Sequence, residues 1–175
     1  MSDPLEVMAT GKYLRMVKRG RWEYADRVNC SGAVVIVAIT DQGRLILTEQ
    51  HRVPVNRRVI ELPAGLSGDL PDQSNEEQAA AATRELLEET GYQAGKMTLL
   101  ASGPPSAGLA TEIVAFFRAT NLRKIHDGGG DEHENILVHE VPLAEVGAFL
   151  CQKTADGLMV DPKIYAGLYL AGCRG

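Results

Sequence analysis

Three glutamates that could share one helix face are the strongest chemical feature of the chain. Glu85, Glu88 and Glu89 lie at positions i, i+3 and i+4 of the stretch RELLEETG, and these positions share one face at 3.6 residues per turn. Carboxylates at this spacing repel one another, and the negative end of the helix dipole near Gly91 adds to the repulsion. A divalent cation removes this penalty, because hard ions such as Mg²⁺ and Mn²⁺ prefer oxygen ligands. From the helix alone, a solvated acidic face neutralised by Arg84 and nearby bases is the alternative.

Short strands around one central helix are expected to position these carboxylates. Strong helix formers fill residues 76–90, and Gly91 is a good residue for ending the helix. Two hairpins are expected earlier in the chain, at residues 13–17 with 22–26 and at residues 33–40 with 44–49. The other expected elements are strands at residues 58–62, 97–101, 113–119 and 136–140, a loop at residues 63–65, and helices at residues 143–151 and 162–171. This order predicts an α+β sandwich without an obvious internal boundary.

Composition and charge exclude several classes of protein. The chain has 175 residues, of which 45% are hydrophobic and 23% charged, as is typical of one globular domain. A net charge of −5 argues against a nucleic-acid partner. No apolar run approaches the roughly 18–20 residues that a membrane span requires, and the N-terminus lacks a signal pattern, so a cytoplasmic protein without a membrane partner is expected. Three cysteines without CxxC spacing indicate neither a disulfide framework nor a zinc site.

The segment around the three glutamates resembles a known family motif. Glu76 and the stretch from Arg84 to Tyr92 read E-x7-R-E-L-x-E-E-x-G-Y, and ELPAG precedes them at residues 61–65. This resembles the Nudix box, G-x5-E-x7-R-E-U-x-E-E-x-G-U, in which U is a bulky aliphatic residue. Leu70 stands where the box has its first glycine, so Gly65 is the natural counterpart and residues 66–75 contain an insertion. The resemblance implies a Nudix α/β/α sandwich with a mixed central sheet, and hydrolysis of a nucleoside diphosphate linked to a second moiety.

The Nudix resemblance also implies roles for individual residues. Glu85, Glu89 and the carbonyl of Ala64 match the ligands of the catalytic metal, for which Mg²⁺ is expected and Mn²⁺ is the alternative. Glu88 is a further candidate for the catalytic machinery. Arg84 matches an arginine that holds the box glutamates in place.

Matches outside the box resemble the ADP-ribose and ADP-sugar pyrophosphatase branch of the family. These matches are Gln50-His51-Arg52 before ELPAG, the hairpin with Gly11-Lys12-Tyr13 and Arg21-Trp22-Glu23, and the segment SAGLATE at residues 106–112. The resemblance implies base stacking by Trp22 and Tyr13, and diphosphate binding by Arg27 and Arg52, whose guanidinium forks suit phosphate oxygens. Within the matching segments, Glu61, Gly108 and Leu109 are further substrate-binding candidates. Without the resemblance, Trp22 would be a core or interface residue and Arg52 an ordinary surface arginine.

A glycine- and acid-rich loop is the candidate source of a catalytic base. Residues 128–135 read GGGDEHEN, and the matching loop of this branch carries a glutamate that positions or deprotonates the attacking water. Glu132 and Glu134 both fit the position of this glutamate, and Glu132 is preferred. The alternative is that the segment is a flexible acidic surface loop without a catalytic role. The branch also implies a homodimer in which the hairpin of residues 1–30 is exchanged between subunits, next to a hydrolase domain at residues 31–175.

The expected function is therefore a Mg²⁺-dependent pyrophosphatase acting on nucleoside diphosphate sugars. Its products would be a nucleoside monophosphate and a sugar phosphate. In the SAGLATE segment, Ala107 stands where ADP-ribose enzymes have a proline, so other nucleoside diphosphate sugars compete with ADP-ribose as the substrate. The alternatives are a housecleaning hydrolase of nucleoside triphosphates or dinucleotide polyphosphates, a non-catalytic nucleotide sensor, and an isomerase on the same fold.

Overall fold

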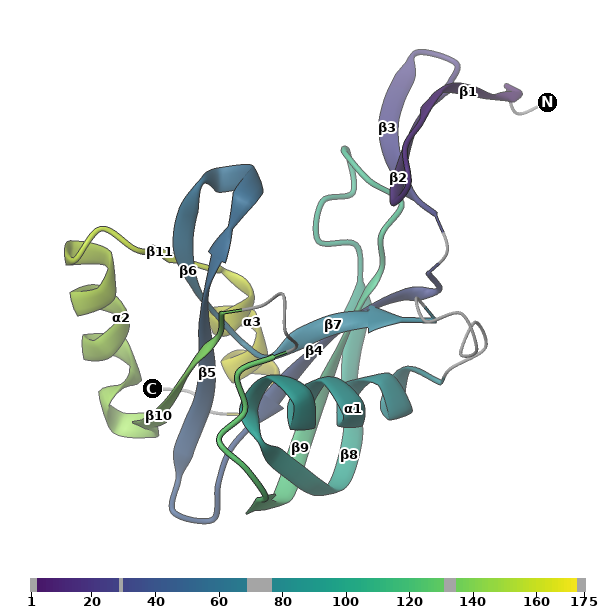
Figure 1. The fold of residues 1–175 in the computed structure, drawn as a ribbon. Helices are drawn as coiled ribbons and strands as arrows, with labels where there is room; N and C mark the ends of the chain where they lie inside the picture. The colour runs from purple at the N-terminus through teal and green to yellow at the C-terminus, as the bar shows by residue number, and fades with distance from the viewer. Residues whose placement is uncertain (1–2, 29, 69–76, 131–134, 173–175) are drawn as a thin grey trace.

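The structure is a computed structural model that describes residues 3–28, 30–68, 77–130 and 135–172. Two four-stranded sheets form the body, and a three-stranded sheet projects from it (Figure 1). One body sheet has the order β10-β5-β6-β11, with β5 at Arg44–Arg52, β6 at Arg57–Glu61, β10 at Leu137–Pro142 and β11 at Met159–Val160. The other has the order β7-β4-β9-β8, with β4 at Gly32–Ala38, β7 at Ala64–Ser67, β8 at Tyr92–Gly103 and β9 at Val114–Lys124. The α+β prediction is confirmed.

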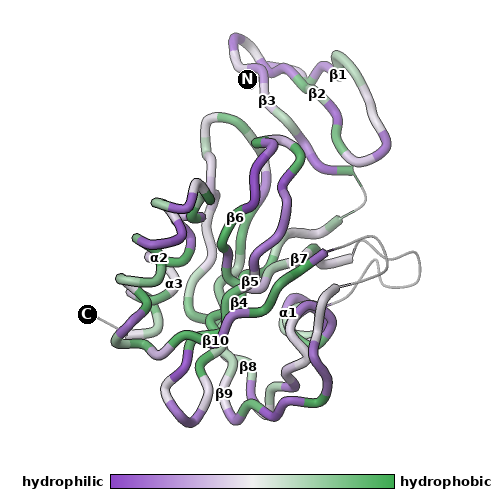
Figure 2. Tube along the Cα trace, turned by 60° about the vertical axis from the view of Figure 1, so that its left-hand side comes forward, coloured by the Kyte–Doolittle hydropathy of each residue, from purple (hydrophilic) through white to green (hydrophobic). Residues whose placement is uncertain are grey.

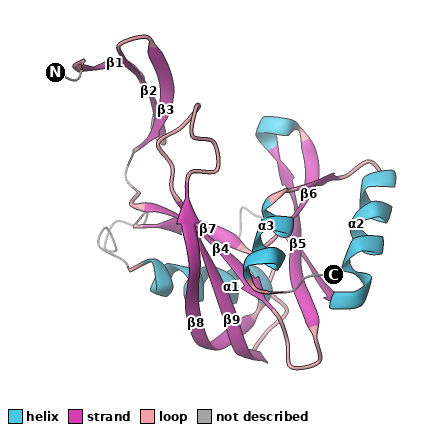
Figure 3. Ribbon diagram, turned by 180° about the vertical axis from the view of Figure 1, so that it is seen from behind, coloured by secondary structure: helices cyan, strands magenta, loops and turns pink. Residues whose placement is uncertain are grey.

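Strand β4 is the centre of the body because both of its faces are buried. Val35 and Val37 join the core cluster that includes Ile164 of α3 (Lys163–Leu170). Val34 and Ile36 point to the opposite face and pack in the cluster that contains Leu86 of α1 (Gln78–Thr90). The continuous apolar run of this strand is therefore explained by helices on both sides, as in other doubly covered sheets. Helices α2 (Val146–Ala155) and α3 lie on the side away from α1 (Figure 3).

The predicted hairpin between residues 33–40 and 44–49 is wrong. Strands β4 and β5 belong to different sheets and share only the isolated bridge between Ile39 and Leu45. Both edges of β4 are occupied instead by β7, which is antiparallel to it, and β9, which is parallel. The turn after β4 thus passes the chain from one sheet to the other. Residues 64–67, at which a loop was expected to continue, form β7.

The projecting sheet is here called the N-terminal arm and comprises β1 (Leu5–Thr10), β2 (Leu14–Arg19) and β3 (Trp22–Arg27). Strands β2 and β3 confirm the predicted hairpin, whereas β1 was not expected. All six residues of β1 are exposed, and Figure 2 shows hydrophobic and hydrophilic segments alternating along the arm, away from the body. Among the described residues, no helix is long and apolar enough to cross a membrane.

Candidate active site

Helix α1 presents its carboxylates to β7, the strand that follows Pro63. The backbone amide of Ala64 donates a hydrogen bond to Oε2 of Glu89 over 3.1 Å, and the Glu89 residue is only 3% exposed. Gly65 lies directly against Glu85, since a Cβ built on Gly65 would be 1.9 Å from the Glu85 Cδ. A side chain at position 65 would therefore displace the carboxylate. The glycine of the ELPAG segment is required by this close approach.

Arg84 holds the acidic face of α1 in place. Its Nη1 contacts Oε1 of Glu85 at 2.9 Å and Oε2 of Glu88 at 3.2 Å, and its Nη2 donates to the carbonyl of Leu66 at 3.2 Å. The arginine therefore ties the helix to β7 while offsetting two of the three negative charges. Glu88 is the outermost of the three, with a side chain that is 53% exposed.

The last turn of α1 is covered by the glycine run that precedes the acidic loop. The amides of Gly129 and Gly130 donate to the carbonyls of Glu89 and Glu88. Gly128 has φ of +75°, and a Cβ there would lie within 2.6 Å of the α1 backbone at Glu89 and Thr90. These glycines thus allow close backbone packing on the carboxylate helix. Glu132 and Glu134, the candidate bases, lie outside the described residues, as does Glu76.

One cavity of about 520 Å³, here called the carboxylate cavity, brings six of the predicted residues together. They are Arg27, Arg52, Glu61, Ala64, Glu85 and Glu89. Cationic and acidic side chains thus line the same space, and they come from the arm, β5, β6, β7 and α1. Two further charged residues line it without having been predicted, namely Glu112 before β9 and Lys163 at the start of α3.

The two arginines of the carboxylate cavity are each held by an acidic partner. Nε of Arg27 donates to Oε2 of Glu112, and Nε of Arg52 donates to Oε2 of Glu61 over 2.7 Å. Burial raises the pKa of Glu61 above its ordinary value, although the hydrogen bond from Arg52 opposes this shift. Lys163 is paired with Asp161 of its own chain segment. The cavity therefore presents oriented, partly neutralised cations to any ligand.

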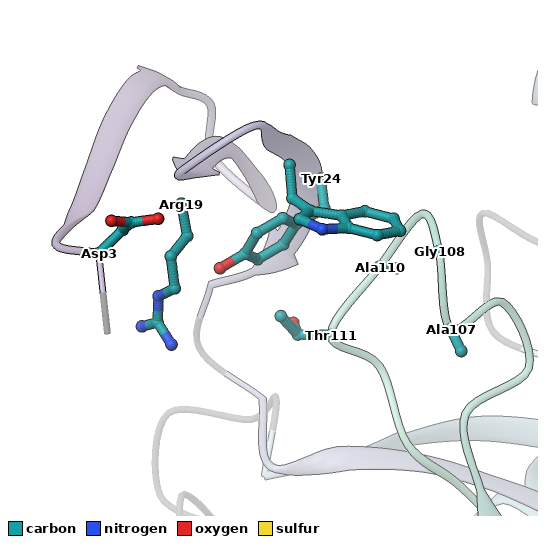
Figure 4. Close-up of a pocket in the computed structure, with 8 residues that line it drawn as sticks. Asp3, Arg19, Tyr24, Ala107, Gly108, Ala110 and Thr111 are labelled. Atoms are coloured by element: carbon teal, nitrogen blue, oxygen red, sulfur yellow. The ribbon is translucent and has the colours of Figure 1, made fainter. Parts of the chain in front are cut away.

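A second cavity, of about 570 Å³, lies between the arm and residues 104–113 and is here called the arm cavity. It is lined by Trp22 and Gly108, as predicted, and also by Arg19, Tyr24 and Thr111. Figure 4 shows Arg19 and Tyr24 of the arm on one side and Ala107, Gly108 and Thr111 on the other. Tyr24 was not predicted, but its signal was present: it is two residues from Trp22 on a strand, so both side chains share a face.

The backbone of the arm is bonded to the segment of residues 104–113. The amide of Ala25 donates to the carbonyl of Leu109 at 2.8 Å, and the amide of Thr111 donates to the carbonyl of Ala25 at 3.1 Å. Leu109 thus contributes its backbone, while its side chain is 63% exposed. Tyr13 lies at the turn between β1 and β2, is 66% exposed, and lines neither of the two cavities.

Comparison with known proteins places this site in a family. The family model for the NUDIX domain matches residues 31–161, which is most of the chain and includes α1 and β7. The chain belongs to the Nudix family. Nudix hydrolases generally use divalent metal ions, and the paired carboxylates of α1 are the oxygen donors that such ions prefer.

Curated relatives of this Nudix chain include pyrophosphatases. It is 38% identical over 127 residues to the ADP-ribose pyrophosphatase of Bacillus subtilis, an alignment covering 72% of the chain and 66% of that protein. It is 36% identical to the GDP-mannose pyrophosphatase of Yersinia pestis, over 81% of the chain and 69% of that protein. It is also 33% identical to the methanol dehydrogenase activator of Bacillus methanolicus, over 77% of the chain and 70% of that protein.

A solved structure shares the fold along nearly the whole chain. The crystal structure of an ADP compounds hydrolase superposes with a TM-score of 0.73 and covers 98% of this chain and 91% of the other, at 23% sequence identity. The predicted Nudix architecture is therefore confirmed, and the N-terminal segment adds a three-stranded sheet where a hairpin was expected.

Proposed function

We propose that this Nudix protein is a Mg²⁺-dependent pyrophosphatase of nucleoside diphosphate sugars. Its reaction would be hydrolysis of the diphosphate bond of an ADP-ribose or ADP-sugar type substrate, giving a nucleoside monophosphate and a sugar phosphate. The observation that carries the proposal is the carboxylate cavity, which is lined by Glu85 and Glu89 together with Arg27 and Arg52. Metal-binding carboxylates opposite guanidinium forks are the pairing that a diphosphate requires.

The residues around the cavity fit a divalent cation. Glu85 and Glu89 both line it beside Ala64, and burial of Glu89 to 3% exposure makes its charge costly unless a cation or hydrogen bonds balance it. Glu85, Glu89 and the carbonyl of Ala64 would hold the ion, with Mn²⁺ as the alternative to Mg²⁺. The bound cation would neutralise diphosphate charge and make a water molecule more acidic.

The chain's own residues would bind and orient the substrate. Arg27 and Arg52 would donate to the diphosphate oxygens, and Glu61 would hold Arg52 at its present angle. Arg84 would act as a positioning residue, because its hydrogen bonds hold the Glu85 and Glu88 carboxylates in place. The general base is assigned to Glu132 or Glu134 on the basis of the branch resemblance. Glu88 is a further candidate beside the metal-binding carboxylates Glu85 and Glu89.

The nucleobase is assigned to the arm side of the site. Trp22 lines the arm cavity with Gly108, and its indole is 56% exposed and thus available for stacking. Tyr13 and Leu109 are also proposed for this side; since neither lines the arm cavity or the carboxylate cavity, we assign their contacts to a complex with a partner subunit. We therefore include a homodimer in the proposal. A cytoplasmic location stays a prediction from the sequence.

The proposal is tested by assaying the purified chain with Mg²⁺ on ADP-ribose, ADP-glucose, GDP-mannose, UDP-glucose and dGTP, with phosphate release coupled to a phosphatase. We expect turnover of at least one nucleotide sugar, its loss with EDTA, and its recovery when Mg²⁺ is restored. Preferential turnover of dGTP would favour the housecleaning alternative, and no turnover would favour a sensor.

The variant Glu89→Gln tests the metal assignment. We expect turnover to fall by about two orders of magnitude or more, because a neutral amide is a poor ligand for a hard cation. Mn²⁺ binding, followed by electron paramagnetic resonance, should weaken in parallel, while circular dichroism stays unchanged. Near-normal turnover in a folded variant would overturn the assignment of Glu89.

A further inference from the structure

A third cavity adjoins the carboxylate cavity and has no arm residue among its lining residues. This groove of about 380 Å³, here called the proline groove, lies between residues 101–105 and helix α3. It shares three lining residues with the carboxylate cavity, namely Pro105, Val114 and Lys163. The two spaces therefore meet at the start of α3.

Residues 104–113 contribute lining residues to all three cavities. Pro104 and Pro105 line the proline groove, Pro105 and Glu112 line the carboxylate cavity, and Thr111 lines the arm cavity. A molecule with its diphosphate in the carboxylate cavity thus has two further spaces nearby: the proline groove, which shares lining residues with that cavity, and the arm cavity, whose Thr111 precedes Glu112. A nucleoside diphosphate joined to a second moiety has the same three-part form.

The lining of the proline groove is mainly hydrocarbon. Most of its lining residues are apolar, among them Pro104, Phe116, Ala166 and Leu170, whereas the polar side chains are Ser102 and Lys163. The Lys163 ammonium is already paired with Asp161. A hexose with hydroxyl groups on every side would leave many of them without partners there, which costs free energy. A flat, weakly polar ring would instead bury apolar surface against the proline and phenylalanine side chains.

We propose that the proline groove is the subsite for the second moiety of the substrate, and that it favours a moiety ending in a flat, weakly polar ring. This inference rests on the proposed function, because it takes the diphosphate to lie in the carboxylate cavity. It adds a preference at the end of the substrate opposite the nucleobase.

A substrate pair that differs at this ring tests the proposal. NADH carries a neutral dihydronicotinamide ring on the ribose that ends ADP-ribose, so the ratio of their kcat/KM values isolates the contribution of the ring. We expect this ratio to exceed one in the wild type. Ala166→Phe fills the groove from an exposed position on α3 and should lower the ratio about tenfold. The control Ala148→Phe, at an exposed position on α2, should leave it unchanged.

Each other outcome overturns the groove assignment. A wild-type ratio of one or less, or an unchanged ratio in Ala166→Phe, would show that the ring does not occupy the groove. A change of oligomeric mass in Ala166→Phe, measured by light scattering, would make the groove a contact between copies of the chain. If ADP-ribose is hydrolysed but the ratio of kcat/KM values does not behave as expected, the groove assignment is wrong and the proposed function stands. If neither substrate is hydrolysed with Mg²⁺ or Mn²⁺, the proposed function and the groove assignment are both wrong.

Discussion

At the scale of single residues, the site depends on how closely β7 approaches the carboxylate helix. Gly65 and Glu85 are in such tight contact that one added carbon would overlap the carboxylate. The Glu85 carboxylate is the end of a flexible side chain, so the fold can accommodate the added carbon by moving it. The residue type at position 65 therefore governs the geometry of the site more than the stability of the fold.

The variant Gly65→Ala should separate these two effects. We expect turnover to fall at least tenfold because the Glu85 carboxylate moves, while the free energy of unfolding changes by about 1 kcal/mol or less. The control is Gly147→Ala on α2, where a Cβ meets nothing within 4 Å and alanine favours the helix. Urea unfolding and steady-state kinetics check both variants, and unchanged turnover in Gly65→Ala would contradict the argument.

At the scale of elements, an ionic cluster around the buried Glu49 joins the β10-β5-β6-β11 sheet to α2. Glu49 of β5 accepts hydrogen bonds from Nε of Arg58 at 2.7 Å and Nζ of Lys153 at 2.9 Å, and His139 Nε2 lies 2.9 Å from its carboxylate. Burial alone would raise the pKa of Glu49, but these three partners outweigh burial and lower the pKa to about 2. The cluster connects β5, β6, β10 and α2, and β10 leads directly from the acidic loop.

The variant Glu49→Gln should destabilise the protein by about 2 kcal/mol at pH 7, because it leaves the half-buried cations of Arg58 and Lys153 without their carboxylate. The pKa of Glu49 is depressed from 4.5 to about 2, so the stabilisation is complete above pH 4.5 and is lost as the pH falls through 2. The difference in the free energy of unfolding between Glu49→Gln and the wild type should therefore become smaller as the pH falls. Urea midpoints measured between pH 7 and pH 3 check this, with exposed Glu23→Gln as the control; a gap independent of pH would contradict it.

The glycine run on the end of α1 gives a second prediction at this scale. In Gly128→Ala, alanine would have a positive φ of 75° and a Cβ within 2.6 Å of backbone atoms of α1. We therefore expect the free energy of unfolding to fall by about 3 kcal/mol. Turnover should also fall, because the glycine run would move away from the end of α1. Gly157 also has a positive φ, of 88°, but a Cβ there meets nothing within 4 Å. Gly157→Ala should cost only about 1 kcal/mol. Thermal unfolding and steady-state kinetics check both variants. Equal losses of stability and of turnover in Gly128→Ala and Gly157→Ala would contradict the packing of Gly128 against α1.

Local sequence signals predicted most elements but not their long-range pairing. The carboxylate spacing, Gly91 and the β2–β3 turn are local signals, and all three correspond to the observed structure. The error at β4 and β5 arose because a tight turn favours a hairpin, whereas the apolar run of β4 requires partners on both edges and both faces. Lys163 and Glu112 reach the carboxylate cavity only through the folding of α3 and residues 104–113 around it. Lys163 lies far from the segments singled out in the sequence, whereas Glu112 ends the SAGLATE segment, in which only Gly108 and Leu109 are predicted as candidates.

At the scale of the whole molecule, the arm leaves an apolar surface uncovered. Leu5, Val7 and Met8 of β1 are each more than 40% exposed, as is Leu14 of β2. An exposed apolar strand with a free edge favours association with another chain.

We expect a homodimer of twice the 18.9 kDa chain mass in light scattering after size exclusion. The double variant Leu5→Lys/Val7→Lys should shift it to the monomer, because charge on β1 opposes burial of that strand. Leu99→Lys, at a 56% exposed position on β8, is the matched control and should keep the dimer. A wild-type monomer at assay concentration would remove the dimer from the proposed function.

The backbone bonds between Ala25 and residues 109 and 111 have a consequence for protein engineering. Because the arm and residues 104–113 form the two walls of one cavity, they must be exchanged together when a chimera is made with a relative of different nucleotide preference. An arm transplanted alone would meet a foreign partner segment, with its donors and acceptors out of register. The arm and that segment therefore form one transferable module, although about eighty residues separate them in the chain.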